Sequence, residues 1–433
     1  MIWREDIETM PLENLKNLQS ERLKKLAGYV YERCPVYKKK FDGAGVHPRD
    51  IRGIEDITKL PFTTKIDMRD NYPFGLFSVP RSEVNEIHIS SGTTGNPTLV
   101  GYTKDDLKLW GEVVARCLCC AGATPDDTIQ IAYGYGLFTG GLGLHYGALE
   151  MGLTILPMSS GQTPRQLKVM TDFQPRIIAC TPSYVLYMME EARELGYDPR
   201  KASWKIGIFG AEPWSEAMRK EIEEGWAMLA TDIYGLSEII GPGVSQECHH
   251  KKGLHVFSDV FYPEIIDPDT NQPVAEGQKG ELVITTLTKQ AIPLIRYRTR
   301  DIVTMTTQPC VCGRTSPRTS KISGRTDDMI VVRGINVFPS QIEEVLLGIE
   351  GTHPQYQLIV DRQAHQMDTV EVQVEVDDKI FHDEIKKMHQ LENEIKKKIE
   401  AVLSVGVSVK LVEPKTIERS IGKAKRVIDK RKL

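Results

Sequence analysis

The segment Lys205-Ile-Gly-Ile-Phe-Gly-Ala-Glu-Pro213 joins a short apolar run to a polar turn that contains glycine and proline. This unit recurs between residues 84 and 238, and in most cases a helical pattern follows the turn. Strands that alternate with helices need crossover connections, so we predict an α/β fold with mostly parallel sheets in this part of the chain. The other β-prone runs are 86–90, 128–133, 154–157, 176–180 and 231–234.

The helical patterns between these runs have recognisable beginnings. Thr103 and Asp106 form a capping-box-like pair, and apolar residues follow them at helical spacing. Three thiols lie on or near this helix, and we interpret them as small apolar side chains in a packed interior rather than as metal ligands or redox centres. They are Cys117, Cys119 and Cys120.

The pattern changes near residue 325. Residues 340–343 resemble a capping box that opens a short helix, and four valines alternate with polar residues between 370 and 376, as in a half-buried strand. Apolar residues at helical spacing from 385 to 402 predict an amphipathic helix. We therefore predict a large N-terminal α/β domain, residues 1–325, and a small mobile α+β C-terminal domain, residues 326–433.

Composition and charge exclude several classes of protein. Fifty-five Lys and Arg stand against fifty-nine Asp and Glu, and the formal net charge of -4 leaves no positive excess to hold a nucleic-acid backbone. The least charged stretch, 136–157, contains His145, Glu150 and six glycines, which is typical of a turn-rich interior and not of a membrane span. The N-terminus has no apolar signal core, and eight cysteines fit a reducing compartment. We expect a cytoplasmic protein without nucleic-acid or membrane partners.

Polar, glycine-rich turns follow the predicted strands, and in a parallel sheet such turns line the ligand crevice. Ser90-Ser-Gly-Thr-Thr-Gly-Asn-Pro-Thr98 offers two flexible glycines and four hydroxyls before Asn96, which suits a phosphate cradle. No Gly-Lys-Ser/Thr follows, so this loop is not that of a P-loop NTPase. Taken alone, a Ser/Thr/Gly loop is more often an ordinary turn.

Two further motifs carry chemistry. Tyr234-Gly-Leu-Ser-Glu238 places a ring that can stack on a base four residues before a carboxylate that can hold Mg²⁺ beside phosphates. Ile295-Arg-Tyr-Arg-Thr-Arg-Asp301 combines three arginines, which can face phosphate, with an aspartate that can accept hydrogen bonds from ribose. The alternatives are a packed tyrosine with a surface glutamate, and a solvated strand with an Arg–Asp pair.

In combination these motifs resemble one group of enzymes. Together with residues 324–334 and Ser420-Ile-Gly-Lys423, they stand in the order found in the acyl-adenylate-forming superfamily, and the resemblance spans most of the chain. Asn96 departs from the pattern, since many members carry lysine there. Within the superfamily, the sequence is most similar to the phenylacetate-CoA ligase family. The segments that carry this closer resemblance are Leu60-Pro-Phe-Thr-Thr-Lys65, 69–77, 135–141, 261–267 and 333–339.

The resemblance implies an ATP-dependent, AMP-forming carboxylic acid–CoA ligase. In this family a carboxylate attacks the α-phosphate of ATP to give acyl-AMP and pyrophosphate, and the thiol of coenzyme A then displaces AMP. Mg²⁺ and cationic groups screen the repulsion between the two anions. We expect phenylacetate or a related aryl acid as the substrate. The alternatives are an adenylation enzyme that loads a carrier-protein thiol and a non-catalytic nucleotide-binding scaffold.

The resemblance also implies roles for single residues of the nucleotide site. Asp301 is expected to bind ribose, Arg325 to lie near the nucleotide, and Glu238 to hold Mg²⁺. The residues expected around the phosphates are Ser91, Thr93, Thr94 and Gly95. Those expected around adenine are Gly210, Ala211, Glu212, Asp232 and Tyr234.

Catalysis and acid binding are expected to involve further residues. Lys423 would reach the carboxylate and the α-phosphate in the first step, and the alternative is one more solvated charge in a basic tail. Asp327 matches the hinge about which superfamily members swing the small domain between the two steps. For His145, a structural role in the wall of the acid pocket is as good an interpretation as substrate contact. The residues of this aromatic, glycine-rich wall are Tyr135, Phe138, Gly140, Gly141 and His145.

One feature lies outside the nucleotide motifs. Cys310-Val-Cys312 supplies two thiolates at close spacing, and Cys248 and His255 can complete a tetrahedral Cys₃His zinc site. His249 or His250 can replace His255, which can instead serve the active site. We expect a structural zinc ion, and a homodimer as the assembly.

Overall fold

The computed structural model describes residues 1–89, 97–137, 139–325, 330–332, 335–362, 368–377, 385–403, 405–418 and 426–431. Its chain packs into two compact units. The larger unit consists of Met1–Cys180, Ala202–Ala211 and Met228–Lys321, and the smaller unit consists of Thr181–Lys201, Glu212–Ala227 and Ile322–Leu433. The smaller unit thus includes two segments that precede residue 228, and a domain boundary at residue 325 stays a prediction.

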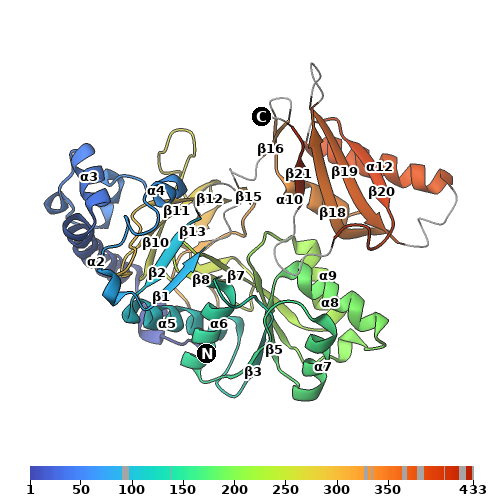
Figure 1. The fold of residues 1–433 in the computed structure, drawn as a ribbon, viewed down its shortest axis with the longest axis horizontal. Helices are drawn as coiled ribbons and strands as arrows, with labels where there is room; N and C mark the ends of the chain where they lie inside the picture. The colour runs from blue at the N-terminus through green and yellow to red at the C-terminus, as the bar shows by residue number, and fades with distance from the viewer. Residues whose placement is uncertain are drawn as a thin grey trace. The chain divides into compact units, whose positions relative to one another are not determined.

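Among the described residues, the larger unit contains a nine-stranded sheet of order β13-β14-β9-β8-β7-β6-β5-β3-β4 (Figure 1). The strands that pair in parallel, as predicted, are β3 (Thr128–Ile131), β4 (Thr154–Pro157), β5 (Ile177–Cys180), β6 (Ile206–Gly210) and β7 (Leu229–Leu236). The strands that continue the sheet in antiparallel pairs are β8 (Gly241–Glu247), β9 (Leu254–Val256), β13 (Met305–Thr306) and β14 (Arg318–Thr319).

Helices connect the parallel strands. The predicted capping box of Thr103 and Asp106 opens α5 (Lys104–Ala121), which packs against α6 (Thr139–Met151) and β8. The three thiols of α5 are buried, which confirms their interpretation as interior side chains. α7 (Thr163–Phe173) follows β4. The helices after β5 and β6, which belong to the smaller unit, are α8 (Pro182–Glu194) and α9 (Glu216–Trp226), with a 3-10 turn at Pro199–Lys201 between them.

A second sheet of the larger unit is antiparallel, with β10 (Phe261–Ile266), β11 (Gly280–Thr286) and β12 (Tyr297–Val303) in this order. β1 (Glu86–Ile89) and β2 (Leu99–Tyr102) form a separate antiparallel hairpin. The pattern had assigned the run at 86–90 to the parallel sheet, and that prediction is wrong. Parallel pairing needs a crossover of a dozen residues or more, and the connection to β2 is shorter than that.

Helices and short 3-10 turns make up the N-terminal region of the larger unit. α2 and α3 lie side by side (Figure 1). Thr63 pairs with Tyr297 of β12, which attaches this region to the antiparallel sheet. The helices are α1 (Glu5–Glu8), α2 (Leu12–Arg33), α3 (Pro35–Gly43) and α4 (Lys65–Asp70), and the 3-10 turns are Pro48–Asp50, Ile54–Lys59 and Arg81–Glu83.

The C-terminal part of the smaller unit has the predicted α+β character. Its described strands form a sheet of order β20-β19-β18-β21, against which α10 and α12 pack, and the alternating valines of β19 lie in the core. α10 begins at Pro339, one residue before Ser340, and the side chain of Gln341 accepts the backbone N–H of Phe338 at 3.1 Å. The elements are β15 (Gly324–Arg325), β16 (Ile330–Val332), β17 (Ile335–Val337), α10 (Pro339–Leu347), β18 (Thr352–Asp361), β19 (Thr369–Val376), α12 (Ile385–Leu403), β20 (Ser408–Val412) and β21 (Val427–Asp429).

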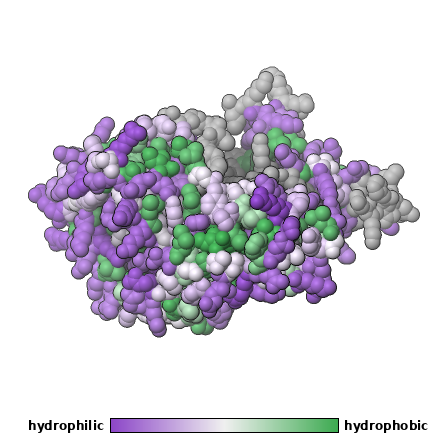
Figure 2. Space-filling view, turned by 60° about the horizontal axis from the view of Figure 1, so that its bottom comes forward, coloured by the Kyte–Doolittle hydropathy of each residue, from purple (hydrophilic) through white to green (hydrophobic). Residues whose placement is uncertain are grey.

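Polar side chains cover much of one face of the molecule (Figure 2). Figure 2 shows hydrophilic side chains over most of the visible face, with apolar residues gathered in limited areas. Within the described ranges, no helix joins sufficient length to sufficient apolar character to cross a bilayer.

Candidate active site

Tyr234 and Asp301, expected at adenine and at ribose, are in direct contact. Tyr234 lies near the end of β7 and Asp301 in β12, so the pair joins the two sheets of the larger unit. The phenol donates a 2.6 Å hydrogen bond to Oδ2 of Asp301, whose backbone N–H donates to Oγ1 of Thr299. Asp301 is only 1% exposed. The structure therefore holds an aromatic ring and a buried carboxylate together at the carboxyl end of a parallel strand.

The turn after β6 brings the backbone close to β7. A Cβ at Gly210 would lie 2.2 Å from the carbonyl oxygen of Ile233, so no larger residue fits there without movement. Ala211 has a φ of 68°, in the left-handed region that residues with a side chain rarely adopt. Such a conformation costs about 1 kcal/mol or more. These two residues form a tight turn with fixed backbone groups beside Tyr234's strand.

The acidic residues expected near adenine have backbone partners. In the larger unit, the N–H of Asp232 donates to Oε2 of Glu247 at 2.9 Å. In the smaller unit, Oε1 of Glu212 accepts the N–H of Ser183 at 2.8 Å, in the first turn of α8, where the helix dipole favours a carboxylate. Arg325 is half-buried in β15.

Glu238, the expected magnesium ligand, is buried in the turn between β7 and β8. Lys65, the first residue of α4, lies with its Nζ 3.8 Å from Oε1 of Glu238. The ammonium of Lys289 donates to the backbone carbonyls of Glu238, at 3.4 Å, and Ile239, at 2.8 Å. A carboxylate oxygen is the type of ligand that Mg²⁺ prefers, so Glu238 fits the role of a magnesium ligand.

Neither Lys65 nor Lys289 was among the residues expected at the site from the sequence. Lys65 is the last residue of segment 60–65, one of the segments that carry the family resemblance. Its place in that segment could have identified it as a candidate site residue. Lys289 belongs to none of the sequence motifs. Only its buried position next to Glu238 in the structure identifies it as a candidate site residue. Burial lowers the pKa of Lys289 to about 8, while the negative charges of Asp106 and Glu238 oppose that shift.

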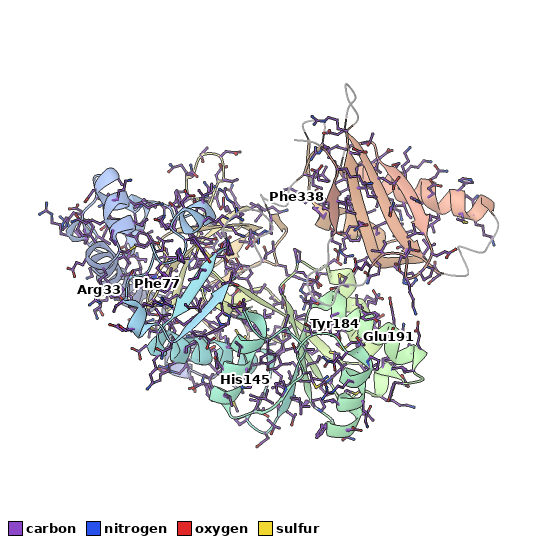
Figure 3. The ribbon with its side chains drawn as sticks, viewed as in Figure 1. Arg33, Phe77, His145, Tyr184, Glu191 and Phe338 are labelled. Atoms are coloured by element: carbon purple, nitrogen blue, oxygen red, sulfur yellow. The ribbon has the colours of Figure 1, made fainter. Side chains whose placement is uncertain are left out.

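Four of the five residues expected at the acid lie together in the loop after β3 and in α6, on which Figure 3 labels His145. The hydroxyl of Tyr135 is 3.3 Å from Nδ1 of His145, and the two rings meet edge to face. A Cβ at Gly141 would lie 2.7 Å from the carbonyl oxygen of Gly134, so glycine lets α6 begin this close to the loop. Gly140 packs against Tyr133. Burial lowers the pKa of His145, so its imidazole is neutral at pH 7.

The remaining predicted site residues lie outside the described residues, and their roles stay predictions. The strands on both sides of the phosphate loop are described, because β1 ends at Ile89 and β2 begins at Leu99. The N–H of Ile89 donates to the carbonyl of Leu137 at 3.1 Å, which attaches this hairpin to the loop of Tyr135. The undescribed residues are Ser91, Thr93, Thr94, Gly95, Phe138, Asp327 and Lys423.

Two arginines of the motif at 295–301 bind carboxylates of the protein itself. Arg296 is buried, pairs with Glu264 at 2.9 Å and stacks on the ring of Phe62. The guanidinium of Arg298 donates to both oxygens of Glu281, which is fully buried. The interpretation that these arginines face phosphate is therefore wrong for both, because their guanidinium groups form ion pairs with buried glutamates of β10 and β11.

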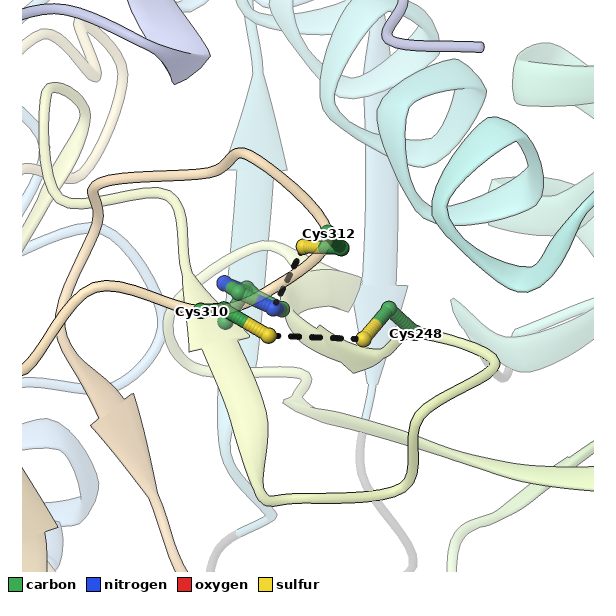
Figure 4. Close-up of side chains that lie close together, drawn as sticks. Cys248, Cys310 and Cys312 are labelled. Atoms are coloured by element: carbon green, nitrogen blue, oxygen red, sulfur yellow. Dashed lines mark hydrogen bonds between the residues drawn. The ribbon is translucent and has the colours of Figure 1, made fainter.

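Cys248, His255, Cys310 and Cys312 meet in one cluster, with all four ligand atoms within 4.8 Å of one another. Figure 4 shows the Cys248–Cys310 contact, at 3.9 Å, and the contact of Cys312 with Nε2 of His255, at 3.4 Å. Two thiolates bound to one tetrahedral zinc ion are about 3.8 Å apart. The exposed His249 and His250 are not in the cluster, and the residues present fit a Cys₃His zinc site.

Further contacts orient the cluster. Nδ1 of His255 lies 3.4 Å from the hydroxyl of Ser316, which leaves Nε2 directed at the thiols. The pKa of Cys312 is lowered by its contact with the Cys248 thiol and by His255, although burial opposes the shift. Nε of Arg314 donates to the buried carboxylate of Glu8 at 2.6 Å, so the loop that carries two of the thiols is tied to α1.

Comparison with known proteins identifies the family. Residues 80–288 match the AMP-binding enzyme family, and residues 334–431 match the AMP-binding enzyme C-terminal domain. The chain is 50% identical to the phenylacetate-coenzyme A ligase of Thermus thermophilus, and the match covers 100% of both proteins. The chain belongs to the phenylacetate-coenzyme A ligase family. The enzyme of the same name from Escherichia coli is 49% identical over 99% of this chain and 97% of its own length.

A solved structure confirms the fold. 2-Hydroxyisobutyryl-CoA ligase, in its postadenylation state with an acyl-AMP bound, has a TM-score of 0.93 and 28% sequence identity. The match covers 99% of this chain and 92% of that protein. The comparisons confirm the expected family, the α/β fold with a small C-terminal domain, and the class of enzyme expected from the sequence, an acid–CoA ligase.

Proposed function

We propose that this acid–CoA ligase activates phenylacetate, or a closely related aryl acetate, as acyl-AMP and transfers the acyl group to coenzyme A. The observation that carries the proposal is the sequence identity of 49–50% to two phenylacetate-coenzyme A ligases over 99–100% of this chain. The contact between Tyr234 and Asp301 supports a nucleotide site at the carboxyl end of β7.

The test measures AMP and pyrophosphate formation from ATP with a panel of acids that includes phenylacetate, benzoate, 3-phenylpropionate and acetate. Phenylacetate should give the highest kcat/KM, with acids one methylene shorter or longer lower by roughly tenfold or more. Absence of pyrophosphate release with every acid would overturn the proposed reaction. A phosphopantetheinylated carrier protein that accepts the acyl group faster than coenzyme A would favour the carrier-loading alternative.

For the nucleotide, we propose that Asp301 accepts hydrogen bonds from the ribose hydroxyls and that the ring of Tyr234 lies beside adenine. A buried carboxylate held by a short hydrogen bond keeps one orientation, which suits a pair of vicinal hydroxyls. The tight turn at Gly210 and Ala211 supports a role of its backbone around the base, and Glu212, Asp232 and Arg325 complete this set. The hydroxyls and N–H groups of the phosphate loop would bind the triphosphate, through Ser91, Thr93, Thr94 and Gly95.

We propose that Glu238 holds the magnesium ion of the nucleotide. When bound, the ion would offset the charge of the phosphates and so allow attack by the anionic acid. The ammonium of Lys65 lies 3.8 Å from the carboxylate of Glu238. It could therefore also pair with phosphate oxygens bound near that carboxylate. Lys423, from the small domain, would place a third positive charge at the α-phosphate during the first step.

For the acid, we propose a pocket lined by Tyr135, Phe138, Gly140, Gly141 and His145. The neutral imidazole and the phenol form a flat, weakly polar surface that suits an aryl ring. The expected hinge at Asp327 would then let the small domain, residues 326–433, rotate from the orientation used for acyl-AMP formation to the one used for thioester formation.

We propose a structural zinc ion at Cys248, His255, Cys310 and Cys312. The ligand types, their spacing and the supporting hydroxyl of Ser316 favour zinc. None of the eight cysteines, all of which lie in the described residues, forms a disulfide, which fits the proposed reducing compartment, the cytoplasm. The homodimer stays a prediction.

A further inference from the structure

Lys289 is a buried ammonium at the back of the turn that carries Glu238. It lies between β11 and β12 and is only 2% exposed. Its Nζ donates to the carbonyls of Ile239 and Glu238 and lies 4.8 Å from the centre of the Tyr102 ring. A single side chain thus holds two consecutive backbone oxygens next to the proposed magnesium ligand.

Other side chains contact neighbouring groups of the same turn and of the start of β8. The hydroxyl of Tyr102 donates to the carbonyl of Ile240 at 3.1 Å, and the indole of Trp110 donates to the carbonyl of Pro242 at 2.9 Å. On the other side of Glu238, the hydroxyl of Ser237 lies 3.0 Å from that of Thr139. The carbonyls of residues 238, 239 and 240 are therefore each held by a side chain, and among these three contacts Lys289 supplies the positive charge.

Lys289 is itself held in place. Asp106, which caps α5, accepts the N–H groups of Gln290 at 2.7 Å and Ala291 at 2.9 Å. This carboxylate fixes the loop on one side of Lys289, and its charge partly offsets the cost of burying the ammonium, as does that of Glu238. A buried charge is by itself weak evidence for a role in stability, because an apolar residue of similar size is often equally stable.

We propose that Lys289 is a positioning residue for Glu238. By holding the carbonyls of residues 238 and 239 and placing a positive charge behind the turn, it directs the carboxylate toward the magnesium-bound nucleotide. This inference rests on the proposed function, in which Glu238 binds magnesium with ATP. Residues that orient a metal ligand in this way commonly change metal affinity by about 10- to 100-fold when they are replaced.

The test compares Lys289→Met, which removes the charge and the donors, with Lys289→Arg, which retains both. Calorimetric titration with ATP is carried out with Mg²⁺ and with EDTA. We expect Lys289→Met to weaken Mg²⁺-dependent ATP binding by roughly tenfold or more and to leave binding in EDTA within about twofold of the wild type. Lys289→Arg should recover part of the loss. Lys205→Met removes a lysine contact with the carbonyl of Ala202, just before β6 begins at Ile206; it is the matched control and should bind as the wild type does.

Unchanged Mg²⁺-dependent binding in Lys289→Met would overturn the inference, as would an equal loss in EDTA. Glu238→Gln separates this failure from that of the proposed function: if Glu238→Gln also keeps full Mg²⁺ dependence, the magnesium role of Glu238 fails. If Lys289→Met does not fold, the test uses Lys289→Arg and Tyr102→Phe, which disturb the same turn less. Both must then weaken Mg²⁺-dependent ATP binding, by less than the roughly tenfold expected for Lys289→Met, and leave binding in EDTA unchanged. In the double variant with Glu238→Gln, the effect of Lys289→Arg should disappear.

Discussion

The hydroxyl of Tyr234 donates to Oδ2 of Asp301 across 2.6 Å, and this contact joins a strand of the mixed sheet to a strand of the antiparallel sheet. The two residues are 67 positions apart, and each would have a separate task at the nucleotide. Their contact means that a change at one should alter the orientation of the other.

Tyr234→Phe tests this coupling, because it keeps the ring and removes the hydroxyl. A hydrogen bond to a buried charged acceptor is worth about 1.5–3 kcal/mol, so the KM for ATP should rise by roughly tenfold or more. The KM for the aryl acid should change little. Tyr31→Phe is the matched control, since the Tyr31 hydroxyl contacts Asp42 at 2.8 Å on the surface. An unchanged KM for ATP in Tyr234→Phe would contradict the proposed ribose site.

Lys423→Ala tests the contribution of the small domain to the first step. Loss of a preorganised charge at the α-phosphate should cost on the order of 3 kcal/mol, or roughly a hundredfold or more in acyl-AMP formation. Thioester formation from supplied acyl-AMP should fall far less. Lys430→Ala, in the same basic tail, is the control and should affect neither step. Equal losses in the two half-reactions of Lys423→Ala would count against the assigned role.

Asp327→Pro tests the hinge, because proline fixes φ at the position expected to rotate. Acyl-AMP formation should survive better than thioester formation, as measured by stopped assays of each half-reaction. Asp327→Ala removes the carboxylate and leaves the backbone free, so both steps should stay near wild-type rates. The hinge assignment fails if the proline variant slows the two half-reactions alike.

Metal analysis tests the zinc site. After dialysis against metal-free buffer, the wild-type protein should hold about one equivalent of zinc, because four ligands close a structural site. Cys312→Ser should hold less than half an equivalent and melt roughly 5 °C lower or more. Cys34→Ser, which alters a buried thiol away from the cluster, should keep its zinc. Less than half an equivalent in the wild type would retire the proposal.

The pH dependence of stability tests the environment of His145. Burial lowers the pKa of this imidazole in the folded protein, so the unfolded chain takes up a proton more readily. The neutral imidazole therefore stabilises the folded protein fully above the unfolded pKa of about 6.5. This stabilisation is lost as the pH falls from there through the lowered pKa of the folded protein. His145→Gln should narrow the difference in Tm between pH 8 and pH 5. Tyr135→Phe retains the imidazole and should keep most of that difference, and a pH-independent offset in His145→Gln would contradict the assignment.

Features that depend on neighbours in the chain could be predicted from sequence. The cap of Thr103 and Asp106, the buried thiols of α5 and the alternating valines of β19 all follow from local spacing. The motifs around Tyr234, Asp301 and Glu238 were likewise found by their order, because each follows a strand or lies in one.

Features that depend on distant partners could be predicted only in part: the sequence indicated the Cys248, His255, Cys310 and Cys312 set, but not the partners of the arginines. Arg296 and Arg298 pair with glutamates 32 and 17 positions earlier, and only the order of strands in the antiparallel sheet brings those charges together. His255 joins the thiol cluster, rather than His249 or His250, because β9 pairs with β14 next to the cysteine loop. No periodicity in sequence carries such information.

The contacts of Glu8 with the cysteine loop bear on the order of folding. Its carboxylate accepts Arg314, and its carbonyl accepts the N–H of Thr315, 307 positions later. Contacts across so long a separation form slowly, because the entropy of closing the intervening chain must be overcome first. We expect the first helix to dock late in refolding, together with the capture of the ion, so that a protein refolded without metal would reach full protease resistance last at its amino end.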